Sequence, residues 1–262
     1  MHRLAARLVP LALALASAWP GGARAASGAR VLSVAAAASA RPPLDELARA
    51  FEATAPGIEV RLTSGASGTF FAQIRSGAPF DVFFSADRDF PQRVVLEGLG
   101  EREVVYAVGR LVVWTPPGSP LDVRRSGLAA LAAPAARKIA IANPALAPYG
   151  RAAEAALRWA GIYDTVKDRL VLGESVAQAA QFAQSGAADA ALLPASLAVL
   201  PALAGGTTAA IPAAAHPRLE QAAVVLRSAR DPALARAFVA LVTGPQGREI
   251  LRRHGYDLPA GE

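Results

Sequence analysis

Residues 63–69 read TSGASGT, and they join a strand-like run, IEVRL at 58–62, to a helix-like run, FFAQIR at 70–75. Glycines let the backbone turn sharply at such a junction, and a Ser or Thr before a helix can cap its free N–H groups. The junction therefore predicts a polar hollow at a helix N-terminus. Such a hollow suits an anion, because the unpaired amides and the helix dipole both place positive charge there.

The same arrangement occurs earlier in the chain. The run VLSVAAAA at 31–38 reads as a buried strand, Ser39 ends it, and Pro42 begins a helix. Ser39 and Ser67 each lie between a strand and a helix, so the two side chains could hold one small oxyanion between them. The alternative is that both serines only cap their helices.

The first 25 residues have the three parts of a cleavable signal peptide. A basic segment begins at His2, an apolar segment runs over 8–19, and Ala23-Arg24-Ala25 has the small residues of a cleavage site. The apolar segment is too short to span a bilayer comfortably. We therefore expect residues 1–25 to be removed during export.

Cysteine is absent from the 262 residues. Its absence excludes disulfides, a thiol nucleophile and thiolate metal sites. It also excludes a lipid-modified N-terminal cysteine, so the exported protein is not expected to be a lipoprotein. A free protein retained behind an outer envelope fits the periplasm.

The formal net charge of +6 does not indicate nucleic-acid binding. Residues 1–25 carry Arg3, Arg7 and Arg24 and no acid, so their removal lowers the charge from +6 to +3. The remaining arginines alternate with acids, and no patch interleaves basic and aromatic residues.

Beyond residue 25, strand-like and helix-like runs alternate with short connections. This order predicts an α/β fold of doubly wound mixed sheets flanked by helices. The run VVYAVGRLVVW at 104–114 is too long for one ordinary strand, so it is either two strands or one extended segment that crosses between lobes. With crossover strands forming a hinge near Gly109 and His216, lobe I would comprise 26–108 and 217–262, and lobe II 109–216.

Candidate binding residues follow several of the predicted strands. In open α/β sheets, ligands bind beyond the carboxyl ends of the strands. Ser39, Ser67, Tyr149 and Val176 all fall at such positions in the predicted order of elements.

The sequence contains few of the residue patterns that catalysis requires. After export only His216 and His254 remain as histidines, and neither follows a strand near the two serines, so no Ser-His-acid triad is expected. The chain also has no P-loop lysine and no cluster with metal-ligand spacing. We therefore expect a binding protein and not an enzyme. A secreted serine hydrolase built on Ser67 is the alternative from a different class.

Several motifs resemble those of the periplasmic molybdate-binding proteins of ABC transporters. The most specific is SGAPFDVFFSAD at 76–87. Others match in the same order over nearly the whole exported chain: VAAAAS at 34–39, SGASGT at 64–69, YGRAA at 149–153, ESV at 174–176 and TGPQG at 243–247. The resemblance implies a two-lobed, hinged periplasmic-binding-protein fold. It also implies capture of molybdate, and of tungstate, for delivery to an inner-membrane permease with its ATPase.

The resemblance implies particular ligand-binding residues. Carried over by position, Ser39 and Ser67 match the two serines that hold the oxyanion, and Tyr149 and Val176 match positions that donate backbone N–H groups. Molybdenum would be present only as the oxyanion, and no cofactor is implied. Because such donors give hydrogen bonds and accept none, they favour a fully deprotonated oxyanion over protonated phosphate. Cavity size would then separate molybdate and tungstate from the smaller sulfate.

The chain departs from the family pattern at one position. The family's tyrosine hydroxyl falls nearest to Pro194, which offers neither an O–H nor an N–H. The phenol of Tyr149 could replace that donor; the alternative is that Tyr149 lies at the lip of the cleft, facing solvent or the other lobe. The missing tyrosine leaves room for another tetrahedral oxyanion such as sulfate. We expect a monomer, because no exposed apolar stripe is evident.

Overall fold

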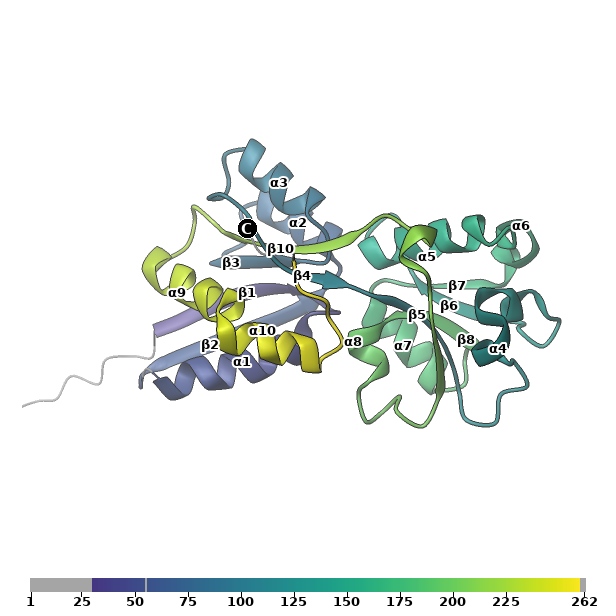
Figure 1. Ribbon diagram of the computed structural model, residues 1–262. Helices are drawn as coiled ribbons and strands as arrows, with labels where there is room; N and C mark the ends of the chain where they lie inside the picture. The colour runs from purple at the N-terminus through teal and green to yellow at the C-terminus, as the bar shows by residue number, and fades with distance from the viewer. Residues whose placement is uncertain (1–29, 55, 260–262) are drawn as a thin grey trace, which may run out of the picture.

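The computed structural model describes residues 30–54 and 56–259, so the proposed signal peptide lies outside the described residues. Two five-stranded mixed sheets lie side by side, each flanked by helices (Figure 1). We refer to the half built on the first sheet as lobe I and to the half built on the second as lobe II.

Lobe I contains a sheet with the strand order β2-β1-β3-β10-β4. Strands β2, β1 and β3 are parallel, whereas β10 is antiparallel to both of its neighbours. Pairing of β1 with β2 runs from Arg30↔Ile58 to Ala37↔Gly65, so both strands end at the same edge. The bounds are β1 Arg30–Ala37, α1 Arg41–Thr54, β2 Ile58–Gly65, α2 Ser67–Arg75, β3 Val82–Ser85, α3 Asp89–Leu96, β4 Val104–Gly109, β10 Leu219–Val225, α9 Pro232–Thr243 and α10 Pro245–Arg253.

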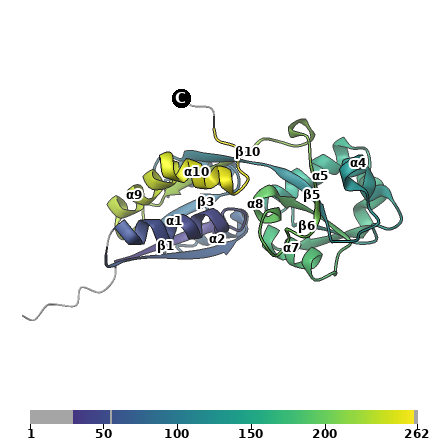
Figure 2. The same ribbon diagram turned by 60° about the horizontal axis from the view of Figure 1, so that its bottom comes forward.

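The core of lobe I follows the apolar spacing of the sequence. Leu44, Leu47 and Phe51 recur at helical spacing on α1 and are buried against the sheet. The ring of Phe51 meets Phe238 of α9 edge-on at 5.3 Å. Helix α10 lies beside α1, where Arg253 pairs with Glu46 at 2.7 Å (Figure 2). The C-terminal helices therefore complete lobe I.

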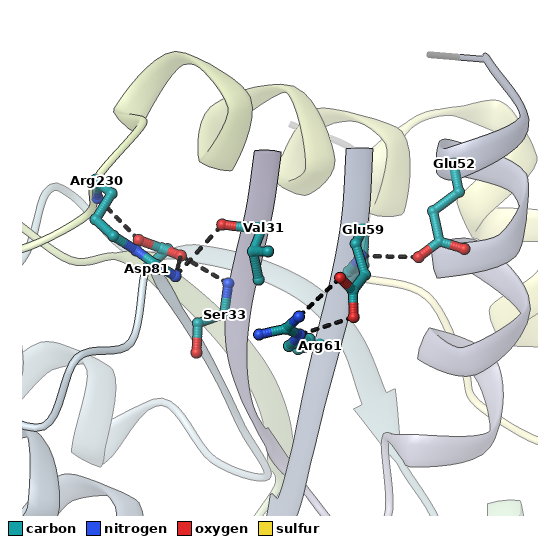
Figure 3. Close-up of polar contacts among 8 residues, drawn as sticks. Val31, Ser33, Glu52, Glu59, Arg61, Asp81 and Arg230 are labelled. Carbon is teal, nitrogen blue, oxygen red and sulfur yellow. Dashed lines mark hydrogen bonds and ion pairs between the residues drawn. The ribbon is translucent and has the colours of Figure 1, made fainter. Parts of the chain in front are cut away.

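A buried carboxylate fixes the start of β3. Asp81 accepts hydrogen bonds from the backbone N–H of Ser33 on β1 at 2.6 Å and from that of Arg230 at 2.8 Å (Figure 3). The Arg230 guanidinium adds an ion pair at 3.1 Å. Asp81 belongs to the most specific sequence motif, and its contacts give it a structural role.

Lobe II contains a sheet with the strand order β7-β6-β8-β5-β9. Strand β6 is parallel to β7 and β8, and β5 is antiparallel to β8 and β9. The bounds are β5 Leu111–Thr115, α4 Val123–Ser126, 3-10 helix η1 Gly127–Ala132, β6 Ile139–Ala142, α5 Pro148–Trp159, α6 Tyr163–Val166, 3-10 helix η2 Lys167–Arg169, β7 Leu170–Gly173, α7 Val176–Gln184, β8 Ala190–Pro194, α8 Ala195–Ala198, β9 Thr207–Ala210 and 3-10 helix η3 Ala213–Ala215.

The long apolar run at 104–114 forms two strands in different sheets. Strand β4 ends at Gly109 in lobe I and β5 begins at Leu111 in lobe II, so the chain crosses between the lobes at Arg110 (Figure 1). It returns between Ala210 at the end of β9 and Leu219 at the start of β10.

Two segments differ from what their sequence predicts. The apolar run at 196–203 predicts a helix, but only the short α8 forms, because Pro201 cannot continue a helix and restricts the residue before it. The sequence predicts an extended segment over 211–216, but this segment contains η3, for which Pro212 is the N-cap residue. None of the described helices combines the length and the apolar character needed to cross a membrane.

Candidate ligand-binding site

The four residues singled out in the sequence lie together in one pocket between the lobes. Ser39 and Ser67 belong to lobe I, Tyr149 and Val176 belong to lobe II, and all four line one small cavity of about 10 Å³. That volume is close to the room needed by one water molecule. The other lining residues are Ala37, Ala38, Gly65, Ala66, Ala86, Ala147 and Pro148, so no charged side chain lines the cavity.

The order of strands and helices explains why these residues meet. Ser39 follows β1, Ser67 is the first residue of α2, Tyr149 is the second residue of α5, and Val176 is the first residue of α7. The preceding strands β1, β2, β6 and β7 are parallel to their partners within each sheet, so their carboxyl ends meet at one edge. The pocket therefore lies against three helix N-termini, each carrying partial positive charge.

The pocket is rich in unused backbone donors. First-turn N–H groups of a helix have no acceptor within that helix. Within residues 30–54 and 56–259, the backbone N–H groups of Ser39, Ser67, Tyr149 and Val176 donate no hydrogen bond to the chain. These four amides are available to an anion.

Ser39 is held in place by its carbonyl and keeps its hydroxyl free. The side chain is buried, and among the described residues its Oγ has no hydrogen-bond partner. The Ser39 carbonyl accepts hydrogen bonds from the Ser196 hydroxyl at 2.9 Å and from the Tyr256 hydroxyl at 2.7 Å. A buried polar group without a partner costs roughly 1–3 kcal/mol, so an oxyanion at Ser39 Oγ would relieve that cost.

Ser67 is fixed by a different contact. Its Oγ accepts a hydrogen bond from the backbone N–H of Ala86 at 3.0 Å. Since the oxygen is the acceptor in that bond, its hydroxyl hydrogen remains free to donate. The N-cap residue of α2 is Ala66, with no side-chain cap. Neither serine hydroxyl caps a helix, so the alternative that Ser39 and Ser67 are only caps is wrong.

Tyr149 lies in the interior and not at an exposed lip. Only 2% of the residue is exposed, and its hydroxyl has no partner among the described residues. A Cβ added at Gly109 would lie 2.1 Å from that hydroxyl, so the phenol packs onto the crossover between the lobes in a space that only glycine leaves. Burial raises the pKa of Tyr149 well above its ordinary value, so the phenol stays protonated and able to donate.

Pro194 ends β8 and does not line the pocket. Two residues further, Ser196 holds the Ser39 carbonyl. The sequence does not predict this role for Ser196 or for Tyr256, because no local pattern links them to a residue so distant along the chain.

The lobes touch directly beside the pocket. The backbone N–H of Gly68 in α2 donates to the carbonyl of Leu146 in lobe II at 2.9 Å. A Cβ at Gly68 would lie 2.8 Å from that carbonyl, so only glycine permits this approach. The small pocket volume therefore reflects lobes that are closed against each other.

The sequence matches the family model of the bacterial extracellular solute-binding proteins over residues 32–257. The chain belongs to this family. It is therefore classed with solute-binding proteins and not with enzymes. The hydrolase alternative also lacks a base, since no histidine lines the pocket that contains Ser67.

Relatives in sequence and solved structures agree with this assignment. The chain is 36% identical over 236 residues to molybdate-binding protein ModA of Azotobacter vinelandii, covering 89% of this chain and 92% of that protein. It is 34% identical over 255 residues to ModA of Rhodobacter capsulatus, covering 97% and 96%. The solved periplasmic molybdate-binding protein of Azotobacter vinelandii superposes with a TM-score of 0.81 at 34% identity, over 87% of this chain and 100% of that one.

The predicted two-lobed periplasmic-binding-protein fold is confirmed by that superposition. The sulfate-binding protein SubI of Mycobacterium tuberculosis shares the fold, with a TM-score of 0.72 at 18% identity over 87% of this chain and 86% of that one. At that identity the likeness concerns the fold alone.

Proposed function

We propose that this protein captures molybdate in the pocket between its lobes and delivers it to the permease of an ABC transporter. The observation that carries the proposal is the donor set. Two buried serine hydroxyls and four unused backbone N–H groups meet in a pocket without charged side chains. The names of the full-length relatives support molybdate as the ligand.

Neutral donors suit a fully deprotonated tetrahedral oxyanion. A closed pocket strips the anion of water, and N–H and O–H dipoles replace that hydration. Tungstate, with the same shape and charge as molybdate, is proposed as a second ligand. The alternative is another tetrahedral oxyanion such as sulfate, which is smaller than molybdate.

The phenol of Tyr149 is proposed as the donor that replaces the family tyrosine missing at Pro194. Ser39 Oγ, Tyr149 Oη and Thr115 Oγ1 are the unpartnered buried side-chain polar atoms among the described residues, and the first two belong to residues of this pocket. An oxyanion that contacted both Ser39 Oγ and Tyr149 Oη would give each of these buried atoms a hydrogen-bond partner.

We further propose the setting in which the protein works. Residues 1–25 direct export to the periplasm, where the protein acts as a soluble monomer and not as a lipoprotein. Its partner is an inner-membrane permease with its ATPase. Within the part of the chain that the structure describes, the large exposed apolar side chains lie on different elements of both lobes, in keeping with a monomer: Leu96, Val104, Trp159, Leu172 and Val199. The sequence prediction places the lobe boundaries at 108/109 and 216/217, and β4 of lobe I extends one residue further, to Gly109.

Calorimetry on residues 26–262 tests the proposed ligand. The protein is titrated in turn with molybdate, tungstate, sulfate and phosphate. Molybdate and tungstate are expected to bind at one site per chain, with sulfate weaker and phosphate without measurable heat. Preferential binding of sulfate would show that sulfate, and not molybdate, is the ligand. If none of the four anions bound, the proposed oxyanion function would be wrong.

A further inference from the structure

An ion pair crosses the cleft beside the pocket. Asp87 follows β3 in lobe I, and Arg151 lies in the first turns of α5 in lobe II. A guanidinium nitrogen of Arg151 lies 2.5 Å from a carboxylate oxygen of Asp87. The Asp87 side chain is only 10% exposed and that of Arg151 39%, so water screens this cross-cleft pair less than an ordinary surface pair.

The two partners are held differently. Asp87 is anchored within lobe I, where its carboxylate accepts hydrogen bonds from the Ser85 hydroxyl at 2.8 Å and from the backbone N–H of Phe90 at 3.3 Å. Arg151 extends from lobe II, and its guanidinium lies 5.5 Å from the centre of the Phe90 ring. Lobe I thus offers a preformed carboxylate and an aromatic face that Arg151 reaches only when the lobes meet.

The pair lies at the boundary between the pocket and a larger outer cavity. Asp87 follows Ala86, whose N–H holds the hydroxyl of Ser67, and Arg151 is two residues beyond Tyr149. Asp87 and Arg151 both line an outer cavity of about 290 Å³. Pro148 lines both this cavity and the pocket, so the two spaces are adjacent.

We propose that Asp87 and Arg151 form a latch that holds the lobes closed over the bound oxyanion and slows its release. The identity of the oxyanion rests on the proposed function. Neither Asp87 nor Arg151 lines the pocket, so the latch is not expected to contact the ligand. Both residues are positioning residues that act through the relative placement of the two lobes.

Other charged groups around Asp87 do not replace Arg151. The outer cavity is also lined by Arg88, Asp89, Arg218 and Glu220. Arg88 bonds to Glu103 at 3.1 Å and Arg218 pairs with Glu220 at 3.4 Å, while Asp89 adds a like charge. Among the described residues, Arg151 is the cation in ion-pair contact with Asp87.

Removing Arg151 alone should weaken binding more than removing both partners. Arg151→Met would leave the Asp87 carboxylate buried without a counter-charge whenever the lobes close. We expect it to weaken molybdate binding about tenfold, mainly through faster release. Asp87→Asn should have a smaller effect, and the double variant should bind more tightly than Arg151→Met alone.

The pH dependence of the Arg151→Met variant separates a latch from a general packing role. Burial raises the pKa of Asp87 above its ordinary value, and loss of Arg151 removes the nearest opposing cation. In this variant the closed form therefore binds a proton more readily than the open form, so acid favours closure. Its affinity should recover as the pH falls, with a smaller change in the wild-type protein.

The matched control is Arg236→Met, which breaks an ion pair with Glu101 at 2.6 Å inside lobe I. Release rates are measured by stopped-flow displacement of molybdate, and lobe closure by the radius of gyration in small-angle scattering. The proposal expects faster release and a larger ligand-free radius for Arg151→Met, and neither for Arg236→Met.

Release rates equal to wild type in Arg151→Met, or single-variant effects that simply add in the double variant, would overturn the latch. If wild-type protein binds none of the oxyanions, the proposed function fails. The latch is then tested by the radius of gyration of the ligand-free proteins. A radius in Arg151→Met equal to that of wild type would show that the ion pair does not hold the lobes closed.

Discussion

Val176→Pro is expected to weaken molybdate binding about tenfold or more while leaving the fold intact. Val176 is the first residue of α7, a position at which helices accept proline. The preceding Ser175 has φ −141° and ψ 171°, which is the extended backbone that a residue before proline prefers. The substitution thus removes one N–H, and a hydrogen bond to a charged group contributes about 1.5–3 kcal/mol.

The matched control for this prediction is Val176→Ala, which shortens the side chain and keeps the N–H. Both variants are titrated with molybdate by calorimetry, and their folding is compared by thermal melting. Val176→Ala should bind within a few-fold of wild type. Equal affinities for Val176→Pro and Val176→Ala would show that this amide does not bind the ligand.

Ser67→Ala is expected to weaken molybdate binding at least tenfold. The substitution removes a buried hydroxyl that lines the pocket, and it leaves the Ala86 N–H without its acceptor. In the ligand complex the anion itself fills the closed pocket, so we expect no water to replace the lost donor. The unpaired Ala86 amide lowers the stability of the free and the bound form alike, so the protein should still fold but melt at a lower temperature.

The comparison variant is Ser228→Ala, whose hydroxyl donates to the Phe80 carbonyl at 3.3 Å on the exposed surface of lobe I. It should bind molybdate as wild type does. Unchanged affinity in Ser67→Ala, measured by calorimetry on protein with a normal melting transition, would remove Ser67 from the site.

Local sequence patterns predict the parts of the site that are built locally. The turn at 63–69 is predicted to join a strand to a helix, and α2 begins at Ser67 and ends at Arg75 in agreement with that prediction. Strand ends followed by helix starts also indicate where ligand donors lie. For this reason the sequence alone assigns residues on four separate segments to the carboxyl ends of the strands.

Contacts between distant segments cannot be predicted in this way. The Ser39 carbonyl is held by Ser196 and Tyr256, which are 157 and 217 residues away in sequence. Asp87 and Arg151 belong to recognised motifs, but their pairing depends on how the two lobes meet. The place of the Tyr149 phenol depends on the space that Gly109 leaves at the crossover.

Anomalous X-ray diffraction from crystals of the molybdate complex tests the central claim most directly, because molybdenum can be located without assuming a site. The account predicts a single peak in the pocket, with molybdate oxygens within hydrogen-bond distance of Ser39 Oγ, Ser67 Oγ and the backbone N–H groups of Tyr149 and Val176. A further contact, from the Tyr149 phenol, would confirm the replacement for the donor missing at Pro194. Molybdenum found instead in the outer cavity beside Arg151, with an empty pocket, would contradict the account.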